Sequence, residues 1–270
     1  MTPSIVFLSD FGYRNEWVGI CHAVIDRIAP GCPVVDLSHG IPPLDVRGGA
    51  LLLVDSLPFI GDEAIALAVV EPSVGRDRDL AVRTRSGRLL VGPDNGILGP
   101  AWEAMDGVAQ AVAVTSADHT LQPVAPSFHA RDVLAPAAAH LANGVLLEEL
   151  GEPVDPATLT RLRLPEPSVE PGKIECEVLD LNRFGNVQLS VRGSHLEAAG
   201  LDGAERIAVR TLSSDVIASR VSTYADVDEG AWGVMVDARG WLTVIRGNPG
   251  NAAAGLGIAS GDLVWLTDGS

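Results

Sequence analysis

The first part of the chain alternates short apolar runs with longer segments whose apolar residues recur at helical spacing. Trp17, Cys21 and Val24, for example, share one face of such a segment, which stops at a proline. Strands and helices in strict succession are typical of an α/β layer with parallel strands. The pattern predicts strands within 4–12, 32–40 and 64–72, and helices within 15–30 and 45–60.

Two further elements complete this part of the pattern. Residues 81–96 turn at a Ser-Gly pair and close on Pro-Asp-Asn-Gly, which predicts a hairpin. Residues 128–144 have the composition of a helix and end in Asn-Gly, a pair favoured at helix C-termini. We therefore predict a Rossmann-like α/β domain with a mainly parallel sheet over residues 1–150.

The character of the sequence changes in the segment 151–172, which contains five prolines. Proline at this density prevents a continuous helix and is typical of a linker. Beyond the linker, short stretches of alternating apolar and polar residues are separated by glycine-rich turns. This pattern predicts an all-β domain, a small barrel or a sandwich, over residues 173–270.

The composition and charge exclude several functional classes for this protein. The 270 residues are 47% hydrophobic, which allows a sizeable core, and the net charge of -16 offers no basic surface for nucleic acid. Three cysteines without paired spacing indicate reduced thiols, and the amino-terminal residues do not resemble a signal peptide. Because no apolar stretch reaches membrane-spanning length, we expect a soluble cytoplasmic protein with neither nucleic acid nor membrane as a partner.

Several common functional motifs are absent from the sequence. Neither GxGxxG after the first strand nor GxxxxGK followed by Ser or Thr occurs, so the usual nucleotide-phosphate loops are not predicted. The sequence also lacks HExxH and GxSxG, and its six histidines show no metal-ligand spacing. We therefore expect no metal and no cofactor.

Polar residues gather where the predicted parallel strands end, at Asp10, at Asp36 to His39 and at Glu71 to Arg78, and His129 stands at the start of a later helix. Strand ends of an open parallel sheet share one side, so these side chains can converge on a ligand. Taken singly, each is also explained as a cap, a turn residue or a surface ion pair. A histidine at the position of His129 can accept a proton near neutral pH, and the structural alternative pairs it with Asp132.

The β part carries candidate contacts in two turn-rich segments, 182–186 and 237–253. Asn182 and Asn186 flank a tight Phe-Gly, and Arg239 stands at a strand turn, where a guanidinium can clamp a carboxylate. Glycines further along the second segment expose backbone amide groups that can form hydrogen bonds to the edge of a nucleotide base. Ordinary hairpin turn chemistry explains the glycines equally well, and Arg239 less well.

The motifs of the two parts, taken in order, resemble those of one family. They are SDFG, DLSHGIPPLDVRGGALLL, VVEPSVGRDR, VGPDNG, SFHARDVLAPAAAHLANG, NRFGN, TYADV, ARGWL and RGNPGNAA. This ordered set spans nearly the whole chain and is similar to that of the S-adenosyl-L-methionine (SAM) hydroxide adenosyltransferases, or SAM hydrolases, which are related to the SAM-dependent fluorinase and chlorinase. The resemblance implies an α/β domain, a β-barrel, and a homotrimer with active sites between the first domain of one subunit and the second domain of the next.

The resemblance also implies a catalytic trio that handles the attacking water. By motif, its positions in this chain are Glu71, Arg78 and His129. The related halogenases carry tyrosine at the positions of Glu71 and His129, so these two residues place the chain with the hydrolases. Family members usually have aspartate where Glu71 stands and where Asn182 stands.

Substrate contacts are implied in the same way. Asp10 matches the carboxylate that holds the ribose hydroxyls, and Tyr224 matches the aromatic side chain that stacks on adenine. Arg239 matches the arginine that binds the methionine carboxylate, and Asn186 matches an asparagine that contacts adenine. The further residues expected at the substrate are Phe128, Asn182, Arg246 and Asn248.

These residues together predict hydrolysis of SAM to adenosine and L-methionine by attack of water on C5′. The leaving thioether is neutral and needs no proton, so the site needs a positioned, activated water and no metal. His129 is the better proton acceptor, because Arg78 beside Glu71 would keep that carboxylate ionised and weakly basic. Two alternatives stay open: a halogenase that forms 5′-halo-5′-deoxyadenosine, and a catalytically weak SAM- or adenosine-binding protein.

Overall fold

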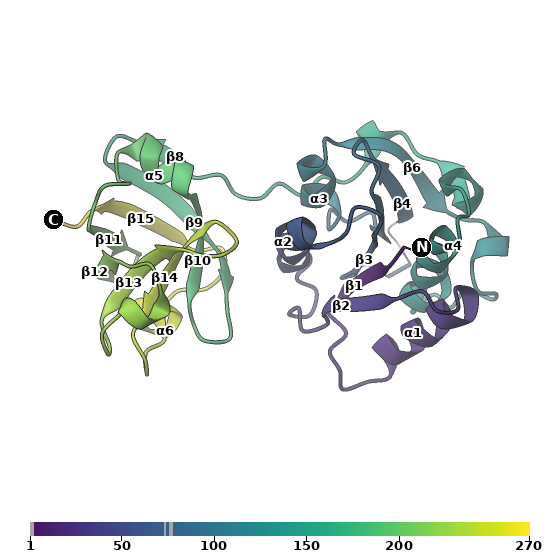
Figure 1. Ribbon diagram of the computed structural model, residues 1–270, viewed down its shortest axis with the longest axis horizontal. Helices are drawn as coiled ribbons and strands as arrows, with labels where there is room; N and C mark the ends of the chain where they lie inside the picture. The colour runs from purple at the N-terminus through teal and green to yellow at the C-terminus, as the bar shows by residue number, and fades with distance from the viewer. Residues whose placement is uncertain (1–2, 73, 76–77) are drawn as a thin grey trace. The chain divides into compact units, whose positions relative to one another are not determined.

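The computed structural model describes residues 3–72, 74–75 and 78–270 of the chain. The chain divides into two compact units, Met1–Arg163 and Leu164–Ser270, and each unit contains one sheet (Figure 1). In the part of the chain that the structure describes, no helix is both long and apolar enough to span a membrane.

The first unit is built on a sheet of seven described strands in the order β2-β1-β3-β5-β4-β6-β7. The strands are β1 (Ile5–Ser9), β2 (Val34–Ser38), β3 (Ile65–Val69), β4 (Asp79–Thr84), β5 (Leu89–Pro93), β6 (Val108–Val114) and β7 (Gly151–Pro153). Parallel pairings join β1 to β2, β1 to β3 and β3 to β5. Antiparallel pairings join β4 to β5, β4 to β6 and β6 to β7.

The predicted α/β class is therefore confirmed, but the described sheet is half antiparallel and not mainly parallel. The predicted hairpin explains the difference, because its short turn brings β4 alongside β5 in the opposite direction. Helices cover both faces of the sheet, and β1 and β3 are buried along their whole length, as strands covered on both sides are.

The helices of this unit divide between two apolar clusters. They are α1 (Trp17–Ile28), α2 (Val46–Ser56), α3 (Gly99–Ala104) and α4 (Ala135–Ala142), with short segments η1 (Leu57–Phe59), η2 (Ala117–His119), η4 (Leu147–Leu150) and η5 (Pro156–Thr158). Side chains of α1 and α4 pack in one cluster and those of α2 and α3 in the other. The predicted helix within 128–144 begins with a π-helical turn, η3 (Ala130–Leu134), which leads into α4.

The second unit is a closed barrel. Its strands are β8 (Ser168–Glu170), β9 (Lys173–Leu181), β10 (Val187–Arg192), β11 (Arg206–Arg210), β12 (Asp215–Arg220), β13 (Trp232–Val236), β14 (Trp241–Arg246) and β15 (Leu263–Asp268), with helices α5 (Gly193–Ala199) and α6 (Ala252–Leu256) and the short segment η6 (Tyr224–Asp226). The order is β10-β14-β13-β12-β11-β15-β9-β8, and a pairing of β10 with β9 closes the barrel. The predicted all-β barrel is thus confirmed, with one apolar cluster filling its interior.

The boundary between the two units falls within the proline-rich segment 151–172. Its first residues, Gly151–Pro153, pair with β6 as strand β7, and Ser168–Glu170 pairs with β9 as strand β8. The ends of the segment expected as a linker are therefore edge strands, positions where prolines are tolerated because one side of the strand has no partner.

Candidate active site

Three titratable side chains of the first unit converge beyond the ends of its central strands. Glu71 lies two residues after β3, Asp79 opens β4, and His129 directly precedes the π-helical turn η3, a structure often found at functional sites. One ligand atom from each residue lies within 4.8 Å of the others. The structure thus places Glu71 and His129 together and adds Asp79, which the sequence reasoning missed.

The imidazole of His129 is oriented by Asp79. Its Nδ1 lies 2.8 Å from Asp79 Oδ2. An ionised carboxylate only accepts hydrogen bonds, so Nδ1 carries the proton and Nε2 presents its lone pair. A methyl group added to Gly75 would lie 3.9 Å from Nε2, so this nitrogen lies close to Gly75. The pair Asp79–His129 can therefore accept a proton at Nε2.

Asp132, the alternative partner of His129, is engaged elsewhere. Its buried carboxylate accepts hydrogen bonds from Arg131 at 2.7 and 2.8 Å and from the backbone N–H of Ala125 at 2.8 Å. Burial acts to raise the pKa of Asp132, but the hydrogen bonds from Arg131 and Ala125 outweigh it and lower that pKa below its usual value. Asp132 thus anchors the segment that leads into His129, and Asp79 takes the place beside the imidazole.

Arg78 forms its ion pair with Asp94, whereas the sequence reasoning expected one with Glu71. The Nε and Nη2 atoms of Arg78 donate to Asp94 Oδ2 at 2.9 and 2.5 Å, and Nη2 also donates to the carbonyl oxygen of Thr158 at 3.0 Å. The Asp94 carboxylate is buried and accepts a further bond from the backbone N–H of Thr160. Because Arg78 immediately precedes Asp79, this pairing fixes the start of β4 and with it the Asp79 side chain.

Asp10 and Phe128, two further predicted site residues, both belong to the first unit and are each held by contacts within it. The Oδ2 atom of Asp10 accepts a hydrogen bond of 2.8 Å from the backbone N–H of Leu44. The Phe128 ring lies edge-on to Phe11 and to Trp17, with ring centroids 6.2 and 6.5 Å away. Phe11 directly follows Asp10, so these aromatic rings connect the end of β1 with the start of η3. Sequence reasoning did not single out Phe11 or Trp17 as neighbours of Phe128.

The predicted contacts of the second unit gather around two adjoining cavities of the barrel. Both cavities are lined by Asn182, Asn186 and Tyr224. The smaller cavity, of about 150 Å³, adds Arg239, and the larger, of about 420 Å³, adds Arg246 and Asn248 among its lining residues. Six residues that lie as much as 66 positions apart in the sequence (182 to 248) thus share one region of the barrel.

The turn between β9 and β10 is organised by the side chain of Asn182. Its Oδ1 accepts hydrogen bonds from the backbone N–H groups of Phe184 at 3.0 Å and Asn186 at 3.1 Å. Either an aspartate or an asparagine can accept these bonds, so the turn geometry tolerates the asparagine found here. Gly185 completes the turn with a φ of +78°, in the left-handed region that favours glycine.

Replacing Gly185 with alanine is expected to destabilise the protein by about 1–2 kcal/mol more than replacing Gly172, a glycine with a similar φ of +75°. A methyl group at Gly185 would collide with the Asn251 side chain, which caps helix α6 by accepting from the N–H of Ala254, whereas nothing lies within 4 Å at Gly172. Urea unfolding of both variants measures the difference, and equal losses would contradict this account of the turn.

Asp237 is the polar centre of the smaller cavity, and sequence reasoning missed it. Its Oδ1 accepts from the backbone N–H groups of Arg239 and Trp241, and its Oδ2 accepts from the side chains of Gln188 and Thr243. The Nε atom of Arg239 lies 3.8 Å from Asp237 Oδ2, and the Arg239 side chain is 37% exposed. Arg239 is therefore held at the cavity while part of its side chain stays accessible to an anionic group.

Known proteins resemble this chain over almost its entire length. Residues 5–151 match the SAM hydroxide adenosyltransferase N-terminal domain, and residues 176–265 match the C-terminal domain. An (R)-S-adenosyl-L-methionine hydrolase of Salinispora tropica is 41% identical over 99% of each chain. A protein of the same name from Thermus thermophilus is 37% identical over 97% of this chain and 98% of its own. A fluorinase of an Actinoplanes species is 27% identical over 94% and 96%.

Solved structures share the fold as well. The crystal structure of an uncharacterized conserved protein from Thermotoga maritima matches with a TM-score of 0.90 at 30% identity, over 97% of this chain and 99% of that one. The protein therefore combines an α/β domain, in which two carboxylates and an imidazole cluster, with a β-barrel that contains polar cavities. The chain belongs to the SAM hydroxide adenosyltransferase family.

Proposed function

We propose that this protein is an enzyme that hydrolyses SAM to adenosine and L-methionine. The observation that carries the proposal is the meeting of Glu71 and His129 with Asp79, a group able to position water and accept its proton. Family membership and identities of 37–41% to proteins named SAM hydrolases support it. The fluorinases that the chain resembles are more distant, at 26–28% identity.

The proposed chemistry is one displacement at C5′ of SAM. An oxygen of water forms the new bond to C5′, the C5′–S bond breaks, and its electron pair stays on sulfur, which leaves as the neutral thioether of methionine. The proton released by the water passes to Nε2 of His129, while Asp79 holds Nδ1–H and stabilises the imidazolium that forms. Glu71, 9% exposed, accepts a hydrogen bond from the same water and aligns it with the C5′–S bond.

The charges of the group suit this substrate. SAM carries a positive sulfonium, and two carboxylates within 4.8 Å of each other and of an imidazole supply negative potential beside the reacting carbon. In this scheme Arg78 is a positioning residue, which acts through its pairing with Asp94 and its place next to Asp79.

The remaining predicted residues would hold the substrate. Asp10 would bind the ribose hydroxyls, Tyr224 would stack on adenine, and Asn186 would contact the base. Arg239 would bind the methionine carboxylate. The side chains proposed to complete these contacts are Phe128, Asn182, Arg246 and Asn248.

We also propose that the protein acts in the cytoplasm as a homotrimer, in which the first unit of one subunit and the second unit of the next form each active site. The resemblance motivates this assembly, and the division of the proposed catalytic and binding residues between two units is consistent with it. Light scattering on the purified protein tests it, and a monomeric mass with full activity would exclude it.

Replacing Arg239 with alanine is expected to raise the KM for SAM by about 10–100-fold with little change in kcat. This factor in KM corresponds to the binding free energy that is lost with one hydrogen-bonded charge pair. The carboxylate that it would bind is remote from C5′, so its loss weakens ground state and transition state alike. Steady-state kinetics measure the change, with Arg206→Ala, an exposed arginine of β11, as the matched control. An unchanged KM would remove Arg239 from the proposed binding residues.

The activity is tested by incubating purified protein with SAM and following the products by chromatography. We expect adenosine and methionine in equal amounts, whether or not chloride or fluoride is added. Formation of 5′-halo-5′-deoxyadenosine that depends on the halide would support the halogenase alternative instead. Tight binding of SAM or adenosine without turnover would favour a binding protein, and either result would overturn the proposed hydrolysis.

A further inference from the structure

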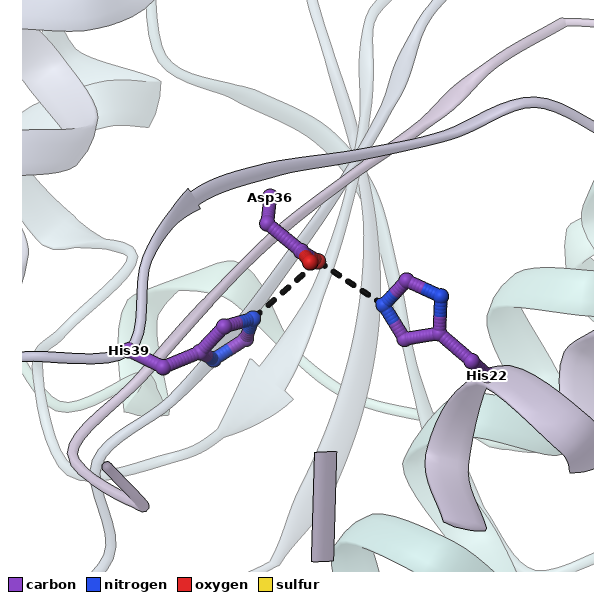
Figure 2. A group of neighbouring side chains, drawn as sticks. All are labelled: His22, Asp36 and His39. Carbon is purple, nitrogen blue, oxygen red and sulfur yellow. Dashed lines mark hydrogen bonds and ion pairs between the residues drawn. The ribbon is translucent and has the colours of Figure 1, made fainter. Parts of the chain in front are cut away.

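A second cluster of titratable residues lies in the first unit where β1 and β2 end. His22 comes from α1, Asp36 from β2, and His39 from the residue after β2 (Figure 2). The Nε2 atoms of His22 and His39 lie 2.8 and 3.0 Å from the same Oδ1 atom of Asp36. Figure 2 shows the carboxylate between the two imidazole rings, and one ligand atom from each residue lies within 4.8 Å of the others.

The ring of His39 is fixed from several sides and fully buried. Its Nδ1 lies 2.7 Å from the Ser9 hydroxyl, and the Phe7 ring packs edge-on against it at 4.6 Å between centroids. Among the described residues, Nε2 of His39 has no hydrogen bond of good geometry, although it is buried and aimed at Asp36. A buried polar atom without a well-formed bond costs free energy, which a metal ion bound to that nitrogen would recover.

We propose that His22, Asp36 and His39 bind a divalent transition-metal ion such as Zn²⁺. Metal bonds to imidazole nitrogen and carboxylate oxygen are about 2.0–2.2 Å long, so neighbouring ligand atoms of an octahedral ion stand about 3 Å apart. The observed separations of 2.8 and 3.0 Å are hydrogen-bond distances close to this spacing, so a small outward shift of the side chains would admit an octahedral ion, and a larger one of about 0.5 Å a tetrahedral Zn²⁺. Two imidazoles and one carboxylate suit Zn²⁺, Co²⁺ or Fe²⁺, whereas Mg²⁺ and Ca²⁺ prefer ligands that are all oxygen.

Metal binding requires a change of tautomer in both histidines. Beside the Asp36 carboxylate each Nε2 carries the proton of its neutral imidazole, and a bound ion takes the lone pair of Nε2 while the proton moves to Nδ1. The Ser9 hydroxyl can accept the hydrogen bond from Nδ1 of His39 and so orient the ring, as partners of metal-binding histidines do.

The cluster is open to solvent on one side and adjoins the segment that carries Asp10. The side chains of His22 and Asp36 are 34% and 28% exposed, which gives an ion access and leaves room for water to complete its coordination. The carbonyl oxygen of His39 accepts a hydrogen bond of 2.7 Å from the N–H of Gly12. A bound ion would therefore stiffen the end of β1. Spacing alone predicted no metal, because these ligands come from three elements.

The test is titration of the metal-free, full-length protein with Co²⁺, followed by its visible absorption, and then competition with Zn²⁺. We expect one Co²⁺ per chain, displaced by Zn²⁺. His22→Gln should weaken binding by at least about 100-fold, because loss of an outer partner alone costs about 10–100-fold. His195→Gln, a histidine of the barrel, should bind as the unmodified protein does.

The proposal is overturned if the unmodified protein takes up no stoichiometric Co²⁺, or if His22→Gln binds it equally well. Loss of binding in His129→Gln but not in His22→Gln would also overturn it, since the ion would then belong to Glu71, Asp79 and His129. Asp36→Asn serves as a second variant if His22→Gln does not fold. Binding is read directly, so the result does not depend on whether the protein hydrolyses SAM.

Discussion

Replacing His129 with glutamine is expected to lower kcat for adenosine formation by about 10²–10⁴-fold, the usual contribution of a positioned general base. Glutamine keeps much of the volume of the side chain but has no nitrogen that can take up a proton. The KM for SAM should change little, because His129 is proposed to contact the attacking water and not the substrate. Steady-state kinetics with adenosine detected by chromatography measure both constants.

The matched control for this variant is His119→Gln. His119 belongs to the same unit, and its Nδ1 lies 3.0 Å from the hydroxyl of Ser116, outside the group of Glu71, Asp79 and His129. We expect this variant to keep kcat within a few-fold of the unmodified protein. If His129→Gln also keeps its kcat, or loses SAM binding as strongly as turnover, His129 is not the proton acceptor.

Replacing Asp79 with asparagine is expected to lower kcat by a similar factor, about 10²–10⁴-fold, with a small change in KM. The bond of 2.8 Å between Asp79 Oδ2 and His129 Nδ1 fixes the tautomer and stabilises the imidazolium. An amide can present its NH₂ group to Nδ1 and so select the wrong tautomer, a change that costs about 10⁴-fold in the serine protease triad. Kinetics and thermal unfolding of the same preparation separate this effect from a loss of folding.

Asp118→Asn is the control for Asp79→Asn, because Asp118 is an exposed aspartate of the same unit. Asp79→Glu adds a sharper comparison, since it keeps the charge and shifts the carboxylate by about 1 Å, which can cost on the order of 100-fold. A folded Asp79→Asn variant with normal kcat would show that Asp79 does not orient the catalytic imidazole.

Much of the fold follows from local patterns in the sequence. Strands β1 and β3 are covered by helices on both faces, and a strand in that position needs a continuous apolar run. Such runs are visible in the sequence, so both buried strands could be predicted. The alternating segments after the linker predict strands, but their closure into a barrel depends on pairings such as that of β9 with β15, more than 80 residues apart in sequence. In the antiparallel half of the first sheet, the hairpin of β4 and β5 follows from its local turn, whereas the pairings of β6 with β4 and with β7 depend on strand order, which local spacing does not encode.

The candidate site was predictable only where a motif marked it. Glu71 and His129 stand in motifs, and the structure places them together. Asp79 belongs to the same group, but it opens a strand 50 residues before His129, and only the tertiary fold joins them. The same holds for His22 and His39, which meet at Asp36 from a helix and from the end of a strand.

The most direct test of the central claim is a turnover in water labelled with heavy oxygen. If Glu71, Asp79 and His129 direct water to C5′, the adenosine formed from SAM carries the label at its 5′ oxygen, and the methionine carries none. The His129→Gln variant should form labelled adenosine far more slowly. Adenosine without the label, or no adenosine above the level of a protein-free control, would contradict the account.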